Sequence, residues 1–216
     1  MLAHVIIRDD PVFINDTKTF YIAAPQLYPQ GDDKMVTALD VANFFIDAAK
    51  DSEDPMTNMR VNKYVYLAQG YALAKLGRPL FNDEIQAWEH GPVVPALYQL
   101  FRTEIKGEPI YKMKGTYRKN TFSDEEIQVM IDVLMDYEEY STAAISRITH
   151  GKDSPWSKAY AGPYTNNPIS LEEMREYFSK KVGKSFIDKY AESRKDPGHV
   201  DADGHYVLPN EFDYDD

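Results

Sequence analysis

The sequence contains no cysteine among its 216 residues. Disulfide bonds, thiol nucleophiles and cysteine-ligated zinc are therefore excluded, and this composition fits a reducing compartment. No apolar run approaches the roughly 20 residues that a membrane-spanning helix needs. The apolar cluster at residues 5–7 is short and is followed at once by Arg8, which is not the pattern of a signal peptide. We therefore expect a cytoplasmic protein without a membrane partner.

Residue patterns that carry catalysis are also missing. The chain has no Gly-rich phosphate loop, no nucleophile elbow and no Ser-Lys motif. Its five histidines are scattered and never show the H-x-x-x-H or H-E-x-x-H spacing of a zinc site. We therefore predict a protein that is not an enzyme and that has no catalytic residues, cofactor or metal.

Positive charge is scarce, and the net charge is −11. An acidic chain is poorly suited to nucleic acid, whose phosphates require Lys and Arg. Residues 196–216 contain seven acids and no Lys or Arg, so they carry −7 of the −11 and leave only −4 for the rest. This tail also has aromatic residues. It is either an unstructured solubiliser or a segment that covers a basic site on a partner protein.

Helical periodicity dominates what is present, and it starts with two segments. Residues 37–50 show apolar residues at helical spacing, and Thr37 with Asp40 resembles a capping box. Residues 59–76 are apolar on almost every side, which is typical of a central helix. Gly77 should end this helix in a left-handed conformation.

The second half of the chain is predicted to be helical as well. A helix at 123–137 has a capping box between Ser123 and Glu126. Pro92 or Pro95 should start a helix that runs to about residue 105. Further helices are predicted at 142–149, from 154, at 170–180 and at 184–193.

Strand signals are weaker. Residues 1–35 contain short β-like clusters, which indicate an extended arm or small strands. Residues 85–88 fit either a strand or a helical turn, and Gly91-Pro92 should form a turn. Alternation in the basic segment 106–120 predicts a surface β-hairpin, which is more simply explained by solvation than by contact with nucleic acid. We predict a mainly α, compact single domain with one small hairpin, divided as 1–35 (extension), 36–193 (helical domain) and 194–216 (acidic tail).

A family resemblance becomes specific at residues 59–98. The segments RVNKYVYLAQGYALAKLGRPLF and EIQAWEHGPVVPALY resemble the Panacea domain signature, a K-L-x-K-L-x-Y-Y-A-Q-G helix, a G-x-P-L-F turn and E-A-W-x-x-G-P-V-x-P-x-L-Y. Thr149-His150 and Pro155-Trp156 match its T-H-x-x-x-P-W element. The resemblance covers roughly residues 36–190. Its motif positions in this chain are Gln69, Gly70, Gly77, Pro95, His150, Pro155 and Trp156.

The resemblance implies a function. Panacea proteins are similar to antitoxins of paired toxin–antitoxin operons, and the domain is thought to neutralise unrelated protein toxins, among them small alarmone synthetase-like enzymes. A member of the family delivers its toxin to a protease, and phages and prophages also carry the domain. The expected function is therefore toxin neutralisation by direct protein binding. The alternative is a phage or prophage adaptor that binds a host protease or polymerase.

Partner contacts are expected at the Pro-stiffened turn and in the tail. A pre-shaped loop loses little entropy when it binds, although the same turn could simply set an angle between two elements. Tryptophan is enriched at interfaces, but the size of Trp88 and Trp156 favours anchorage in the core. The predicted contact residues are Trp88, His90, Gly91, Pro92, Val93, Val94, Tyr98, Tyr206, Phe212 and Tyr214.

Overall fold

The computed structural model describes residues 36–52, 55–102, 107–115 and 121–183, together with the backbone of four short strands outside these ranges. The strands β1 (His4–Arg8) and β2 (Thr19–Ala23) pair in parallel. The strands β6 (His199–Val200) and β7 (Tyr206–Val207) pair in antiparallel fashion. The N-terminal segment therefore contains short strands, as one of the two sequence interpretations predicted.

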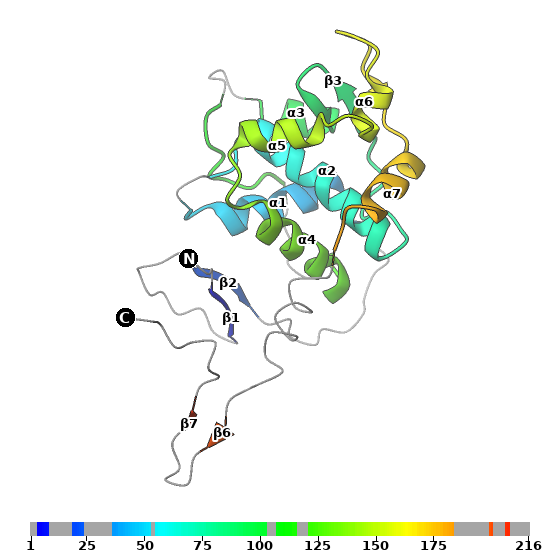
Figure 1. Cartoon of the computed structure of the whole chain (residues 1–216). Helices are drawn as coiled ribbons and strands as arrows, with labels where there is room; N and C mark the ends of the chain where they lie inside the picture. Colours follow the sequence, from blue (N-terminus) through cyan, green and yellow to red (C-terminus); the bar gives the residue numbers. More distant parts are fainter. Residues whose placement is uncertain are drawn as a thin grey trace, which may run out of the picture. The chain divides into compact units, whose positions relative to one another are not determined.

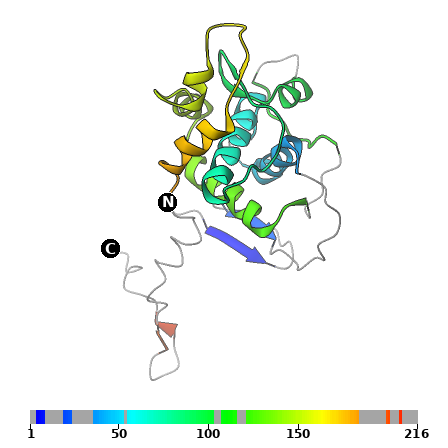
Figure 2. The same ribbon diagram turned by 90° about the vertical axis from the view of Figure 1, so that its right-hand side faces the viewer.

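The described residues form a mainly α fold built around one central helix. This helix, α2 (Asn58–Lys75), contacts α1 (Ala38–Ala49), α4 (Asp124–Tyr137), α5 (Thr142–Thr149) and α7 (Leu171–Ser179). In Figures 1 and 2 these helices surround α2. Fourteen of its residues are buried, which confirms the prediction made from its all-round apolar sequence. A helix covered by neighbours on every side has no room for a polar stripe.

The helix boundaries follow from side-chain caps that the sequence had indicated. Both predicted capping boxes, Thr37 with Asp40 and Ser123 with Glu126, are present. Ser170 likewise accepts a hydrogen bond from the backbone N–H of Glu173 at the start of α7. Each such cap satisfies a backbone N–H that the helix itself leaves unpaired.

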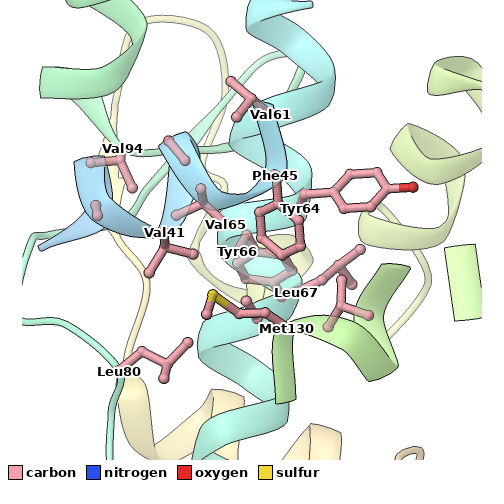
Figure 3. Packing of buried hydrophobic residues seen from close by; sticks show 14 of the residues in the cluster. Val41, Phe45, Val61, Tyr64, Val65, Tyr66, Leu67, Leu80, Val94 and Met130 are labelled. Carbon is pink, nitrogen blue, oxygen red and sulfur yellow. The ribbon is translucent and has the colours of Figure 1, made fainter. Parts of the chain in front are cut away.

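The hydrophobic core lies where α1, α2 and α4 meet. Figure 3 shows Val41 and Phe45 of α1 packed against α2, with Met130 of α4 on the same cluster. The rings of Phe45 and Tyr64 meet edge to face, with centroids 5.2 Å apart. Such geometry is favoured by the aromatic quadrupole. No described helix is long and apolar enough to cross a membrane.

A small antiparallel sheet decides between the two alternatives for residues 85–88 and corrects the prediction that Gly91-Pro92 forms the turn. Its order is β4 (Gly91–Val93), β3 (Gln86–Trp88) and β5 (Asn167–Pro168), so residues 86–88 are a strand rather than a helical turn. Gly91 pairs with Trp88 and Pro92 with Ala87. The turn therefore lies at residues 89–90, and Gly91-Pro92 begins the returning strand. A positive φ of 107° at Gly91 lets the chain reverse there.

Two further predictions are corrected in position. The helix after the sheet, α3 (Pro95–Leu100), begins at Pro95 but ends well before residue 105. The predicted hairpin in the basic segment is absent from residues 107–115, whose only β pairing is a single bridge between Thr57 and Pro109. Residues 116–120 lie outside the described part. The bridge and the hydrogen bond from Ile110 N to Met56 O (2.7 Å) tie this segment to the start of α2 instead.

Contacts divide the chain into residues 1–182 and residues 183–216. The helix predicted at 184–193 lies outside the described residues. The division into an extension, a helical domain and an acidic tail therefore stays a prediction.

Candidate partner-binding site

One part of the motif, which includes His150, Pro155 and Trp156, lies where α2, the β3–β4 hairpin and α6 (Pro155–Ala159) come together. Gly91 is at the centre. A Cβ atom at this position would lie 2.6 Å from His150 Nε2 and 2.7 Å from Lys63 Nζ. Glycine is therefore required twice, by the positive φ and by the close approach of two side chains.

The lysine side chain of Lys63 is buried beneath this hairpin. Its side chain is 1% exposed, and its Nζ donates a hydrogen bond to the carbonyl oxygen of Pro92 (3.1 Å). Burial lowers the pKa of Lys63 to about 7, because an ammonium group loses its hydration inside the protein. Lys63 thus fastens the hairpin to α2, and its side chain loses its proton at a much lower pH than an exposed lysine does.

Three aromatic rings are stacked beside this lysine. His150 lies on Trp156 with centroids 4.0 Å apart and an interplanar angle of 14°, and Trp156 lies on Tyr160 at 4.7 Å and 16°. Burial and the nearby Lys63 lower the pKa of His150, while the His90 backbone opposes the shift. A neutral imidazole is therefore favoured at position 150, which suits a stack against apolar rings.

The two tryptophans are tied to one another through the backbone. Trp156 Nε1 donates to the carbonyl oxygen of Trp88 (2.8 Å), and Trp88 Nε1 donates to Gln86 Oε1 (2.9 Å). The Trp88 ring also meets Tyr98 edge to face at 5.0 Å. Both indoles are only partly buried. Both tryptophans therefore anchor the hairpin and still expose part of their rings to solvent. Anchorage in the core describes the buried part of each ring, and contact with a partner stays a prediction for the exposed part.

Two asparagines of α2 hold the chain that leaves the hairpin. Asn62 Oδ1 accepts the backbone N–H of Val94 (3.0 Å), and Asn58 Nδ2 donates to the carbonyl oxygen of Tyr98 (3.0 Å). Val94 is the N-cap residue of α3 and has no side-chain cap of its own. Asn62 thus gives the backbone N–H of this N-cap residue a buried side-chain acceptor.

A second part of the motif has a structural role at the other end of α2. Gln69 is fully buried, and its amide bonds to both backbone groups of Phe81 and to the N–H of Leu80. At Gly70, a Cβ would lie 2.3 Å from the Phe178 ring. Gln69 therefore holds the turn after α2 by hydrogen bonds, and Gly70 lets α7 pack closely against α2.

The predicted contact residues divide into two groups. Gly91, Pro92, Val93 and Val94 are buried within the chain itself, whereas His90 is exposed and Trp88 and Tyr98 are partly exposed. Their contact with a partner stays a prediction. The side chain of Tyr206 lies outside the described residues, as do Phe212 and Tyr214. Of the structural positions, Pro95 and Pro155 open α3 and α6, and Gly77 has the predicted positive φ of 70°.

Sequence reasoning missed Tyr164. This residue is 94% exposed and has a φ of 66°, an uncommon conformation for a residue with a bulky side chain. Its loop leaves α6 and returns through β5, which pairs with β3. In Figure 1 the loop, in yellow, projects beyond β3 and α6. The sequence signal was Gly162-Pro163 followed by polar residues, a pattern that indicates a turn but not an exposed ring.

We expect Gly91→Ala to destabilise the protein more than Gly77→Ala. Both glycines have a positive φ, but nothing lies within 4 Å of a Cβ at Gly77. The Gly77 variant therefore measures the backbone cost alone, about 1–2 kcal/mol. The Gly91 variant adds overpacking against Lys63 and His150, about 1–3 kcal/mol more. Urea unfolding of both variants measures the difference, and equal losses would show that the two side chains move aside freely.

The described residues contain no group of three or more His, Cys, Asp or Glu side chains that could hold a metal ion. What they build is a buried framework that carries a partly exposed aromatic surface. We call this surface the aromatic ledge; it consists of Trp88, His90, Tyr98, Trp156, Tyr160 and Tyr164.

Fold and site define a small helical module whose motif residues support a surface. Residues 61–157 match the family described as antitoxin SocA-like, Panacea domain. Antitoxin SocA of Caulobacter vibrioides is 30% identical over 151 residues, which cover 65% of this chain and 79% of that protein. The chain belongs to the SocA-like Panacea domain family. No solved structure matches it.

Proposed function

We propose that the protein is an antitoxin that neutralises a cognate protein toxin by binding it directly. The observation that carries the proposal is the similarity to antitoxin SocA along 79% of that protein's length. The family match over residues 61–157 also includes the hairpin and its supporting residues Lys63, His150 and Trp156. The resemblance to the family suggests a small alarmone synthetase-like enzyme as one class of toxin.

The aromatic ledge is the surface we propose for the toxin. Aromatic residues, and Trp and Tyr in particular, contribute a large share of the binding energy at many protein interfaces. Three ledge residues, Trp88, Trp156 and Tyr160, are also held in place beforehand, by the stack on His150 and by the hydrogen bond from Trp156 to the Trp88 carbonyl. A surface that is already ordered loses little conformational entropy on binding.

Tyr164 is the ledge residue that best separates binding from folding. Its loop is closed by hydrogen bonds from Thr165 Oγ1 to the Gly162 carbonyl (2.8 Å) and from Asn167 Nδ2 to the Ala159 carbonyl (2.9 Å). These hydrogen bonds hold the backbone of Tyr164 in its strained conformation, while the Tyr164 side chain is almost fully exposed. Backbone strain of this kind often accompanies a functional site.

We expect Tyr164→Ala to weaken toxin binding at least tenfold, in the range of an interface hot spot. The free energy of unfolding should change by less than about 0.5 kcal/mol, because the side chain has few contacts to lose. The toxin to use is the product of the adjacent reading frame, if that product stops growth. Co-purification, isothermal titration calorimetry and growth rescue measure the effect.

Tyr111→Ala is the matched control, since Tyr111 is also exposed (65%) but lies outside the ledge. Its affinity for the toxin should equal that of the unchanged protein. Equal affinities for the Tyr164 variant and the unchanged protein would remove this face from the interface. Capture of a host protease or polymerase in place of a toxin would favour the adaptor alternative.

A further inference from the structure

A cavity of about 310 Å³ lies between α2, α4, α5 and α7. None of the residues that line it belongs to the aromatic ledge. Tyr66 and Tyr71 line it from α2, Tyr137 from α4 and Tyr177 from α7. A volume of this order is within the range of small-molecule sites.

Three exposed, positively charged side chains contribute to the lining of this cavity. Arg147, Lys152 and Lys181 line it, and no carboxylate does so among the described residues. None of the three forms an ion pair within the described part of the chain. Lys181 Nζ lies 5.1 Å from the centroid of the Tyr177 ring, so one cation is already placed over an aromatic wall. In a protein with a net charge of −11, three cations that line one cavity are a local exception.

The hydroxyl group of Tyr66 is the second independent observation. Tyr66 is 1% exposed, and its hydroxyl has no hydrogen-bond partner in the described structure. The hydroxyl of the neighbouring Tyr71, by contrast, donates to Asp136 Oδ2 (2.8 Å). Burial, followed by the influence of Tyr177 and Tyr137, raises the pKa of Tyr66, so this hydroxyl keeps its proton and remains a donor. A buried hydroxyl without a partner is costly unless something supplies one.

We propose that this cavity binds a small phosphate monoester with a flat ring, the chemistry of a nucleoside monophosphate. The three cations match a dianionic phosphate, with Arg147 able to hold it in bidentate fashion. The tyrosine walls receive the ring, and the Tyr66 hydroxyl donates to the ligand. This site is independent of the toxin-binding surface proposed above.

Isothermal titration calorimetry with the full-length protein tests the proposal, with adenosine monophosphate, guanosine monophosphate, adenosine and inorganic phosphate as probes. At least one monophosphate should bind, and adenosine and inorganic phosphate should each bind at least tenfold more weakly. The double change Lys152→Gln and Lys181→Gln should lower the affinity at least tenfold. The matched control, Lys112→Gln with Lys114→Gln, removes two exposed lysines outside the cavity and should leave it unchanged.

Tyr66→Phe separates a binding role from a purely structural one. Without ligand this variant should melt at the same or a higher temperature, because it loses an unpaired buried hydroxyl. Its affinity for the monophosphate should nevertheless fall about tenfold, which corresponds to one lost hydrogen bond. Absence of monophosphate binding, or binding that neither the lysine changes nor Tyr66→Phe weakens, would overturn the proposal. Toxin neutralisation is measured separately and does not depend on this result.

Discussion

Replacing Gln69 by leucine is expected to lower the free energy of unfolding by about 3–5 kcal/mol. The Gln69 amide bonds to three buried backbone groups: Phe81 O (2.8 Å), Leu80 N (2.8 Å) and Phe81 N (3.3 Å). Leucine has a similar volume but no polar atoms, so these groups would be left without partners away from water. Each unsatisfied buried group costs about 1–3 kcal/mol.

Chemical denaturation measures this loss, and Gln99→Leu is the matched control because Gln99 is exposed on α3. The control should change the stability by less than about 0.5 kcal/mol. A loss below about 1 kcal/mol for Gln69→Leu would mean that the turn at residues 80–81 finds other partners. It would also make Gln69 an unexplained feature of the family motif.

Lys63→Met should remove most of the protein's gain in stability between pH 7 and 9.5. The unfolded chain binds a proton at Lys63 up to a pKa near 10.5, whereas the folded protein releases it near 7. Between these values the unfolded state binds more protons, so stability rises with pH. The rise from this one residue is as much as about 3 kcal/mol across that window.

Methionine keeps the length of the lysine side chain and removes its titration, so the rise should disappear. It also removes the donor to the Pro92 carbonyl, which lowers stability by a pH-independent amount. The window ends below pH 10, because burial raises the pKa of Tyr66, Tyr71 and Tyr137, and their unfolded forms ionise above that pH.

Urea unfolding at several pH values measures the slope for both proteins. Lys112→Met is the control, since Lys112 is exposed and its slope should match that of the unchanged protein. Parallel curves for Lys63→Met and the unchanged protein would show that Lys63 is protonated in the folded state throughout this range.

Local patterns in the sequence were sufficient for the main helices. The capping boxes at Thr37 and Ser123 and the glycine at position 77 lie where the sequence places them. Each depends on residues three or four positions apart, so the chain's own spacing contains the information. The Panacea signature likewise identified the family, because its Gly, Pro and Trp residues stand at fixed intervals.

Only the tertiary contacts explain why particular residues are needed at particular positions of this chain. Gly91 looked like a turn residue, yet it begins a strand that pairs with Trp88, and Lys63 and His150 approach it from distant parts of the sequence. The basic segment looked like a hairpin, but residues 107–115 are tied to the start of α2. Neither packing partner can be read from a local window of residues.

The sequence by itself determined the helical class, most helix ends and the family, since these depend on spacing along the chain. The tertiary structure decided what its polar and aromatic residues do. It buried Lys63, stacked His150 on Trp156, exposed Tyr164 and left the hydroxyl of Tyr66 unpaired, in a cavity that three cations also line. Burial and charge at a site depend on which distant segments meet there, and only the packed fold specifies those encounters.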